Sequence, residues 1–292
     1  MLDLGLVMPE VDGVRHRFVD IEGIRFHVAE AGEGEPLLML HGWPQNWFMW
    51  RKLVPPLGRG YRLLMLDLRG FGWSDAPLSG YGIERLADDV LGVADALDID
   101  RFGLMGHDWG GLIAYLVALR EPCRVQRLMT LNIIHPWPPA LALPANLPRS
   151  IYALRNAAGL SARQMRDDPA PFHQYIRGAM GMTEVIGETE MAIYLGPLER
   201  PERRHVTTLI YRTFFSRDVI LMGLGRYRRR HLGVETLSLF GEDDRCMHAG
   251  LLRGYEGHAR DMSVELVPDC GHFIVDEKPE LVAARAQEFF RD

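Results

Sequence analysis

Short apolar runs recur along the chain, and most of them do not alternate with polar residues. They lie at 36–40, 62–67, 102–107, 127–132, 235–240 and 263–267. Runs without alternation are typical of strands buried on both faces of a parallel sheet. Between them, the segment 83–97 carries its apolar residues on one face at helical spacing. Strands that alternate with helices predict an α/β fold with a doubly wound, mostly parallel sheet flanked by helices.

The two ends of the chain complete this pattern. Residues 15–30 form two strand-like runs joined at Glu22-Gly23, which predicts a hairpin. Residues 278–290 fit a last helix.

The alternation of strands and helices stops at Pro136. The stretch HPWPPALALPANLP is too rich in proline to form one regular element. From about 149 to 231 the pattern is helical throughout, with breaks near Gly159, Pro169, Gly181 and Pro197. We therefore expect a helical cap at 135–231, inserted into a core of residues 1–134 and 232–292. A cap in this place covers the carboxyl ends of the strands, where open α/β sheets bind ligands.

The turn GHDWGG, residues 106–111, joins a predicted strand to a helix that reads GLIAYLVALR. Its pattern G-x-D-x-G stands where α/β hydrolases carry the nucleophile elbow G-x-S-x-G. The glycines allow close packing around a residue held at a strained backbone angle. Asp108 could instead cap the helix that follows. The strand–turn–helix setting favours the nucleophile.

A carboxylate at the elbow restricts the reaction. A hydroxyl needs a base before it attacks, whereas Asp108 is ionised at pH 7 without help. Attack on an acyl carbon would give a reactive anhydride. Attack on a saturated carbon gives an ordinary ester that water can later cleave. Asp108 therefore indicates displacement at an sp3 carbon that carries an epoxide oxygen or a halide.

The ester must be cleaved by water, and water needs a base. His272, in DCGHF after the strand at 263–267, stands where an α/β-hydrolase histidine belongs. Its orienting acid should follow the strand at 235–240, where GEDD offers two aspartates. We prefer Asp244, at the fourth place of Gly-x-x-Asp, over Asp243. The order nucleophile, acid, histidine is the α/β-hydrolase order, which disfavours a mere surface histidine.

Two backbone N–H groups are expected to form an oxyanion hole for cleavage of the ester. One belongs to HGWPQNWFMW after the strand at 36–40, and we assign it to Trp43. The other belongs to Trp109, next to the nucleophile.

The orienting acid of some α/β hydrolases follows an earlier strand, which here is the strand at 127–132. That position holds Asn132 and no carboxylate.

These motifs together resemble those of α/β-hydrolase-fold epoxide hydrolases, over essentially the whole chain. The resemblance rests on HGWP (41–44), DLRGFGWSD (67–75), GHDWGG (106–111), GEDD (241–244) and DCGHF (269–273). This set is specific to epoxide hydrolases and haloalkane dehalogenases. It implies an α/β-hydrolase fold with an inserted helical cap.

The resemblance also implies two cap tyrosines that hold and protonate the epoxide oxygen. An alkoxide is a poor leaving group, so a phenol donor is needed. Tyr211, in LIYRTF, matches the second tyrosine of the family. Tyr152 lies where the first one falls, but Ala153 replaces the glutamine that usually follows. Tyr175 is the alternative for the first position.

Aromatic and neighbouring residues predict an apolar substrate pocket, although such residues are also ordinary core material. We expect His41, Pro44, Trp47, Trp137 and Tyr175 to line it.

A haloalkane dehalogenase would use the same nucleophile and is the main alternative. Such enzymes bind halide through Trp109 and a second Asn or Trp donor. Many of them carry Asn where Trp43 stands here, and the Pro44 that follows favours the epoxide. Fluoroacetate dehalogenases place arginines just after the nucleophile to bind the substrate carboxylate. This chain has Trp109 and Ile113 at those positions, which disfavours that class.

A non-catalytic binding protein on this fold is a third alternative. It would have no need to keep Asp108, Asp244 and His272 together. The sequence thus favours an epoxide hydrolase that forms a diol through an aspartyl ester.

Composition narrows the remaining possibilities. The formal net charge of −6 gives no reason to expect nucleic acid as a partner, and the basic run 226–230 fits a solvated surface. No stretch approaches the roughly 20 apolar residues of a membrane span, and no signal peptide is evident.

Three cysteines without metal-ligand spacing indicate reduced thiols in a cytoplasmic protein. We expect no cofactor and no metal. A homodimer is compatible with the sequence.

Overall fold

An eight-stranded sheet organises the computed structural model of the protein, which describes residues 7–139, 146–181 and 185–291. The strand order is β1-β2-β4-β3-β5-β6-β7-β8. The strands are β1 (Val14–Ile21), β2 (Ile24–Ala31), β3 (Glu35–Leu40), β4 (Tyr61–Leu66), β5 (Phe102–His107), β6 (Val125–Leu131), β7 (Thr236–Gly241) and β8 (Met262–Val267). β1 and β2 form the predicted hairpin, β2 pairs antiparallel with β4, and β3 to β8 pair parallel. The predicted α/β class is confirmed.

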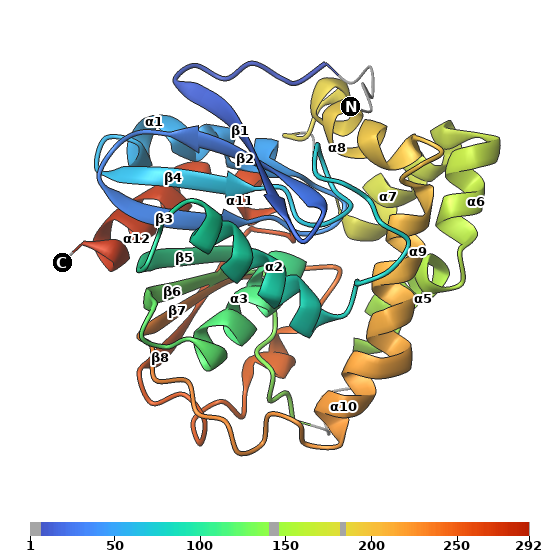
Figure 1. Cartoon of the computed structure of the whole chain (residues 1–292). Coiled ribbons are helices and arrows are strands. Elements are labelled where there is room, and N and C mark those ends of the chain that lie inside the picture. Colours follow the sequence, from blue (N-terminus) through green and yellow to red (C-terminus); the bar gives the residue numbers. More distant parts are fainter. Residues whose placement is uncertain (1–6, 140–145, 182–184, 292) are drawn as a thin grey trace.

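Helices cover both faces of the sheet, which explains the apolar runs without alternation. Every residue of β5 and β7 is buried. α2 (Ile83–Ala96) and α3 (Trp109–Arg120) pack on one face, and α1 (Val54–Leu57) and α12 (Pro279–Phe290) lie on the other (Figure 1). The shorter helices of this part are η1 (Trp47–Leu53), η5 (Ala249–Leu252) and α11 (Ile274–Glu277).

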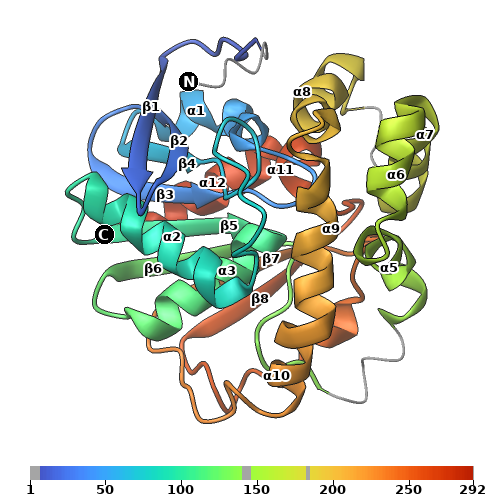
Figure 2. The same ribbon diagram turned by 45° about the vertical axis from the view of Figure 1, so that its right-hand side comes forward.

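A run of helices lies between β6 and β7, as the sequence predicted. It comprises η3 (Pro148–Ser150), α5 (Ile151–Ala157), α6 (Leu160–Asp167), α7 (Pro169–Met180), α8 (Glu188–Glu199), α9 (Arg204–Thr213), the π-helical turn η4 (Phe214–Asp218) and α10 (Val219–Gly223). These helices stand beside the carboxyl ends of the parallel strands (Figure 2). The predicted boundaries of the cap and core remain predictions. Residues 1–6 and 292 of the core and 140–145 and 182–184 of the cap lie outside the described residues.

Breaks within the helical run have local causes. Gly159 and Gly181 adopt left-handed φ angles of 78° and 67°, which favour glycine and end a regular helix. Pro197 does not break α8 but lies inside its last turn. A proline there leaves the carbonyl of Ile193 without its usual helical donor. The side chain of Asn46, on the loop after β3, donates to that carbonyl at 2.8 Å and so ties α8 to the sheet domain.

Within the described ranges, no helix has both the length and the apolar character needed to cross a lipid bilayer.

Candidate active site

Asp108 stands at the turn between β5 and α3, at a strained backbone angle. Its φ is 48° and its ψ is −121°, outside the regions that non-glycine residues ordinarily occupy. At two glycines beside the turn, other backbone segments of the same chain approach too closely to leave room for a side chain. A Cβ at Gly110 would lie 2.1 Å from the carbonyl oxygen of Leu40, and one at Gly42 would lie 2.4 Å from Cβ of Asp108. The glycines therefore let the loop after β3 close on the elbow.

Backbone N–H groups hold the carboxylate of Asp108. The N–H of Trp43 donates to its Oδ2 at 3.0 Å, and the N–H of Trp109 also hydrogen-bonds to the carboxylate. Burial raises the pKa of Asp108 to about 6, while His272 and the two N–H groups oppose that rise. The group is thus mostly ionised at neutral pH although it is buried. These are the two donors that the sequence assigned to an oxyanion hole.

Asp244 and His272 come together from the ends of β7 and β8. Nδ1 of His272 lies 2.9 Å from Oδ2 of Asp244. The same carboxylate accepts from the side chain of Asn132, at the end of β6, at 2.7 Å, and from the N–H groups of Cys246 and Met247 at 2.6 and 2.9 Å. Burial alone would raise the pKa of Asp244, but His272 and these donors hold it below its ordinary value. Asp244 is therefore a fixed negative charge behind the imidazole.

The outer nitrogen of His272 lies on the side of the ring away from Asp244. Its Nε2 is buried and has no hydrogen-bond partner among the described residues. Burial alone would lower the pKa of His272, but the neighbouring Cys246 and Asp244 raise it above its ordinary value. The loop that carries His272 is also held by His107, whose Nε2 lies 2.8 Å from the carbonyl oxygen of His272. With Nδ1 bonded to Asp244, Nε2 is the atom through which the imidazole can exchange a proton, as an acid while the ring is protonated and as a base once it is neutral.

One cavity of about 730 Å³ connects the elbow to the cap. Asp108 and Trp109 line it from the sheet, and Tyr152 and Tyr211 line it from α5 and α9. Apolar residues form much of the remaining lining, namely Leu112, Ile133, Ile134, Trp137, Phe214, Phe215, Val219 and Met222. The cavity therefore fits an apolar small molecule within reach of a carboxylate.

The two cap tyrosines pack edge to face on the cap side of this cavity. Their ring centroids lie 6.0 Å apart, and the indole of Trp43 lies 6.0 Å from Tyr152 and 5.5 Å from Tyr211. The phenol oxygen of Tyr211 is buried without a hydrogen-bond partner in the described part of the chain. Burial raises the pKa of both phenols well above the ordinary value, so both keep their protons. Tyr175 does not line the cavity, and its ring instead stacks under the guanidinium of Arg155 at 4.5 Å.

Of the other predicted pocket residues, Trp137 lines this cavity, and His41, Pro44 and Trp47 do not. His41 is buried beneath the loop, where its Nε2 accepts the N–H of Leu68 at 3.0 Å. Pro44 follows Trp43 through a cis peptide bond and is buried in the same loop. Trp47 points toward β1 and β2, where its ring contacts His16 and His27. These side chains follow β3 in sequence, but they pack into the core.

Sequence reasoning missed two residues of the site. Asn132 was noted only as the lack of a carboxylate, yet its amide holds the orienting acid. Cys246 lines the cavity beside His272. Its place two residues after Asp244 was a usable signal, because a residue there must lie near the partner of that acid.

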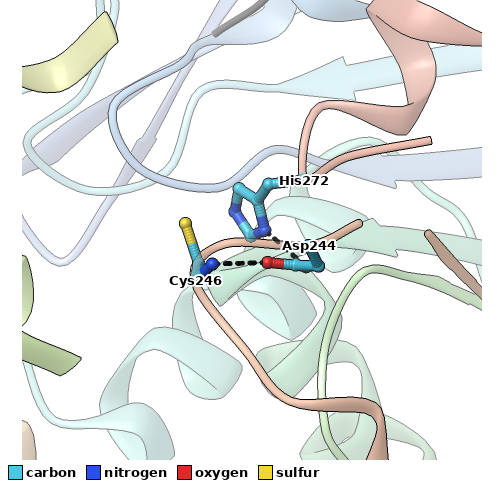
Figure 3. Close-up of side chains that lie close together, drawn as sticks. All are labelled: Asp244, Cys246 and His272. Atoms are coloured by element: carbon cyan, nitrogen blue, oxygen red, sulfur yellow. Dashed lines mark hydrogen bonds and ion pairs between the residues drawn. The ribbon is translucent and has the colours of Figure 1, made fainter. Parts of the chain in front are cut away.

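Asp244, Cys246 and His272 also form a group that could hold a metal ion (Figure 3). Their potential ligand atoms all lie within 4.8 Å of one another. Asp244 and His272 already bond to each other, however, so an ion that took both would break their hydrogen bond. The arrangement therefore fits an acid–histidine pair with an adjacent thiol better than a dedicated metal site.

Comparison with known proteins identifies a family and several related proteins. A family model described as the alpha/beta hydrolase fold matches residues 35–279. A soluble epoxide hydrolase from Corynebacterium sp. (strain C12) is 29% identical over 294 residues, which cover 95% of this chain and 97% of that protein. Epoxide hydrolase 3 of Xenopus tropicalis is 30% identical over 287 residues, covering 92% of this chain and 76% of the relative. The solved structure of epoxide hydrolase CorEH without ligand superposes with a TM-score of 0.80 at 27% identity, over 95% of this chain and 98% of the other.

Proposed function

Because the chain belongs to the alpha/beta hydrolase fold family and is related to epoxide hydrolases, we propose that it hydrolyses an apolar epoxide to a vicinal diol. One observation carries this proposal. The carboxylate of Asp108 shares a cavity with two phenols whose protons are retained. A nucleophile and a neutral proton donor on the two sides of one apolar cavity are what opening of an epoxide requires.

In the first half-reaction Asp108 attacks an epoxide carbon from behind. The carbon–oxygen bond of the ring breaks as the new ester bond forms. Tyr152 and Tyr211 donate hydrogen bonds to the ring oxygen, and one of them transfers its proton to it. The products of this step are a hydroxyalkyl ester on Asp108 and a transient tyrosinate.

In the second half-reaction water attacks the ester carbonyl of Asp108. His272 takes a proton from the water through Nε2, and Asp244 stabilises the imidazolium through Nδ1. The N–H groups of Trp43 and Trp109 stabilise the oxyanion. His272 then protonates the departing diol oxygen, and the remaining proton of the Asp108 carboxyl group returns to the tyrosinate. The balance is one epoxide and one water consumed for each diol.

The cavity gives less support to haloalkane dehalogenation. A halide leaving group needs N–H donors rather than a proton. The indole Nε1 of Trp43 already donates to the hydroxyl of Thr207 at 3.0 Å. It is therefore engaged with the cap and is not directed at a leaving group.

The decisive test follows the covalent ester. His272→Gln is expected to accumulate an adduct with an aryl epoxide, seen as added mass on the peptide that carries Asp108. A single wild-type turnover in ¹⁸O-water should place the label in the Asp108 carboxyl group. Label found only in the diol would mean that water attacked the epoxide directly, and the proposal would be wrong. Halide release from a haloalkane without diol formation from the epoxide would favour the dehalogenase instead.

A further inference from the structure

The proposed reaction leaves one reactive group of the cavity unused. Cys246 follows Asp244 by two residues on the loop after β7, and its side chain extends on the same side of the loop as the imidazole of His272 (Figure 3). It lines the cavity that holds Asp108. The thiol of Cys246, a ring nitrogen of His272 and a carboxylate oxygen of Asp244 all lie within 4.8 Å of one another.

The histidine beside this thiol has an open position. Nε2 of His272 is buried and has no hydrogen-bond partner among the described residues, while Nδ1 is bound to Asp244. This is the order of groups in which a cysteine is activated by a histidine that an acid orients. Burial raises the pKa of the Cys246 thiol to about 11, although His272 opposes the rise. The free thiolate is scarce, so reaction of this sulfur depends on a neighbouring base.

The other two cysteines differ in access or in surroundings. Cys123 is exposed at the end of the segment after α3, and it does not line the cavity. Cys270 is buried, and its Sγ lies 3.7 Å from the carbonyl oxygen of Gly271. Among the three cysteines, Cys246 alone combines a cavity wall with a base.

We propose that Cys246 is a modification site for soft electrophiles of the α,β-unsaturated carbonyl class that enter the substrate cavity. In its neutral form, His272 takes the proton of the thiol as the sulfur bonds to the β-carbon of the electrophile. The carbon–carbon double bond shifts its electrons to form an enolate, and the imidazolium returns the proton to the α-carbon. The product is a thioether, nothing is oxidised or reduced, and no group leaves.

Such an adduct switches the enzyme off. It occupies the cavity next to Asp108 and fills the space beside Nε2 where the water of the second half-reaction would stand. This consequence rests on the proposed epoxide hydrolysis, whereas the labelling itself does not. The cavity would thus close to further epoxide once a reactive carbonyl compound has entered it.

N-ethylmaleimide is the probe for a test by peptide mass mapping. In the wild type we expect label on Cys123 and Cys246, with epoxide hydrolysis falling more than tenfold in step with the label on Cys246. After the same exposure, Cys246→Ser should hydrolyse the epoxide as fast as an untreated sample of the same variant. Cys123→Ser should lose activity as the wild type does.

The variant His272→Gln tests whether His272 activates the thiol of Cys246 or whether the thiol reacts simply because the probe can reach it. We expect label on Cys246 to form about 100-fold more slowly in this variant, the size of a general-base contribution. The rate at exposed Cys123 in the same sample is the reference, and a cooperative thermal unfolding transition shows that the variant is folded. An equal labelling rate at Cys246 with and without His272 would overturn the proposal. So would loss of activity that follows label on Cys270 or proceeds in Cys246→Ser.

These outcomes separate the two proposals. A protein that opens no epoxide but labels Cys246 with dependence on His272 would refute the proposed hydrolysis and leave the modification site standing. A protein that makes diol and leaves Cys246 unlabelled would do the reverse.

Discussion

The two walls of the cavity differ in charge and in how their side chains are held. On the sheet wall, ionisable groups stand at strand ends, and backbone N–H groups fix the carboxylates of Asp108 and Asp244. On the cap wall, Tyr152 and Tyr211 are neutral and are held by ring contacts with each other and with Trp43. Strand ends can present several backbone donors to one point, whereas helices present side chains that pack. The sheet therefore supplies charge, and the cap supplies neutral phenols.

Burial raises the pKa of the acidic groups on both walls, but the proposed reaction needs the phenols protonated and Asp108 ionised. It raises the pKa of the phenols, so they keep the protons that the proposed reaction has them donate. It also raises the pKa of Asp108, which in the proposed reaction attacks only in its ionised form. The N–H donors and His272 limit that rise to about 6. The sheet wall thus needs compensating contacts that the cap wall does not.

Breaking the charge on the sheet wall should give the largest effect. Asp244→Asn removes the negative charge that orients His272 and favours the wrong tautomer, so kcat should fall by roughly 10⁴-fold. Steady-state diol formation measures the loss. Asp243→Asn is the matched control, because Asp243 is exposed and should leave kcat unchanged. Similar losses in both variants would contradict the assignment of Asp244.

Removing the donors of the cap wall should cost less, because two phenols share the task. Tyr152→Phe and Tyr211→Phe should each slow ester formation by about 100-fold, the lower range for a general acid. Stopped-flow burst kinetics would isolate that step. Tyr175→Phe is the control, since this ring lies outside the cavity. Full activity in Tyr211→Phe would remove the phenol-donor role from that residue.

The pH dependence separates the walls without a substitution. Asp108 must be ionised, and its pKa is about 6, so kcat/KM should fall about tenfold per pH unit below that value. The tyrosines keep their protons throughout this range and add no further step. Single-turnover ester formation between pH 4.5 and 8 measures the profile. A rate that stays constant down to pH 4.5 would show that Asp108 is not the attacking group.

The cost of a buried charge should appear in stability as well. The raised pKa of Asp108 means that the folded protein becomes less stable as pH rises from about 4 to 6. Asp108→Asn should therefore raise the free energy of unfolding by about 3 kcal/mol at pH 8, with little gain below pH 4. Urea unfolding at the two pH values tests this. Tyr211→Phe removes no charge and should show no such pH-dependent gain.

Local sequence predicted the sheet wall well because its residues follow strands directly. The elbow, the acid and the histidine stand after β5, β7 and β8, and parallel strands bring their carboxyl ends to one edge. The cap wall was harder to predict. Helical spacing gives the helices but not the direction in which Tyr152 and Tyr175 face. The predicted pocket residues after β3 lie in the core and not along this cavity, and adjacency in sequence does not decide between those two places.

The sequence by itself determined the order of strands and helices and the chemistry that stands at each strand end. These depend on periodicity and on turn residues, which are local properties of the chain. Only the tertiary structure decided that Tyr152 and Tyr211 share a cavity with Asp108 while Tyr175 does not. It also decided that Asn132 supports Asp244 and that the sulfur of Cys246 lies near His272. Those contacts join segments far apart in the chain. Their geometry is set by how the cap packs on the sheet, which no local pattern encodes.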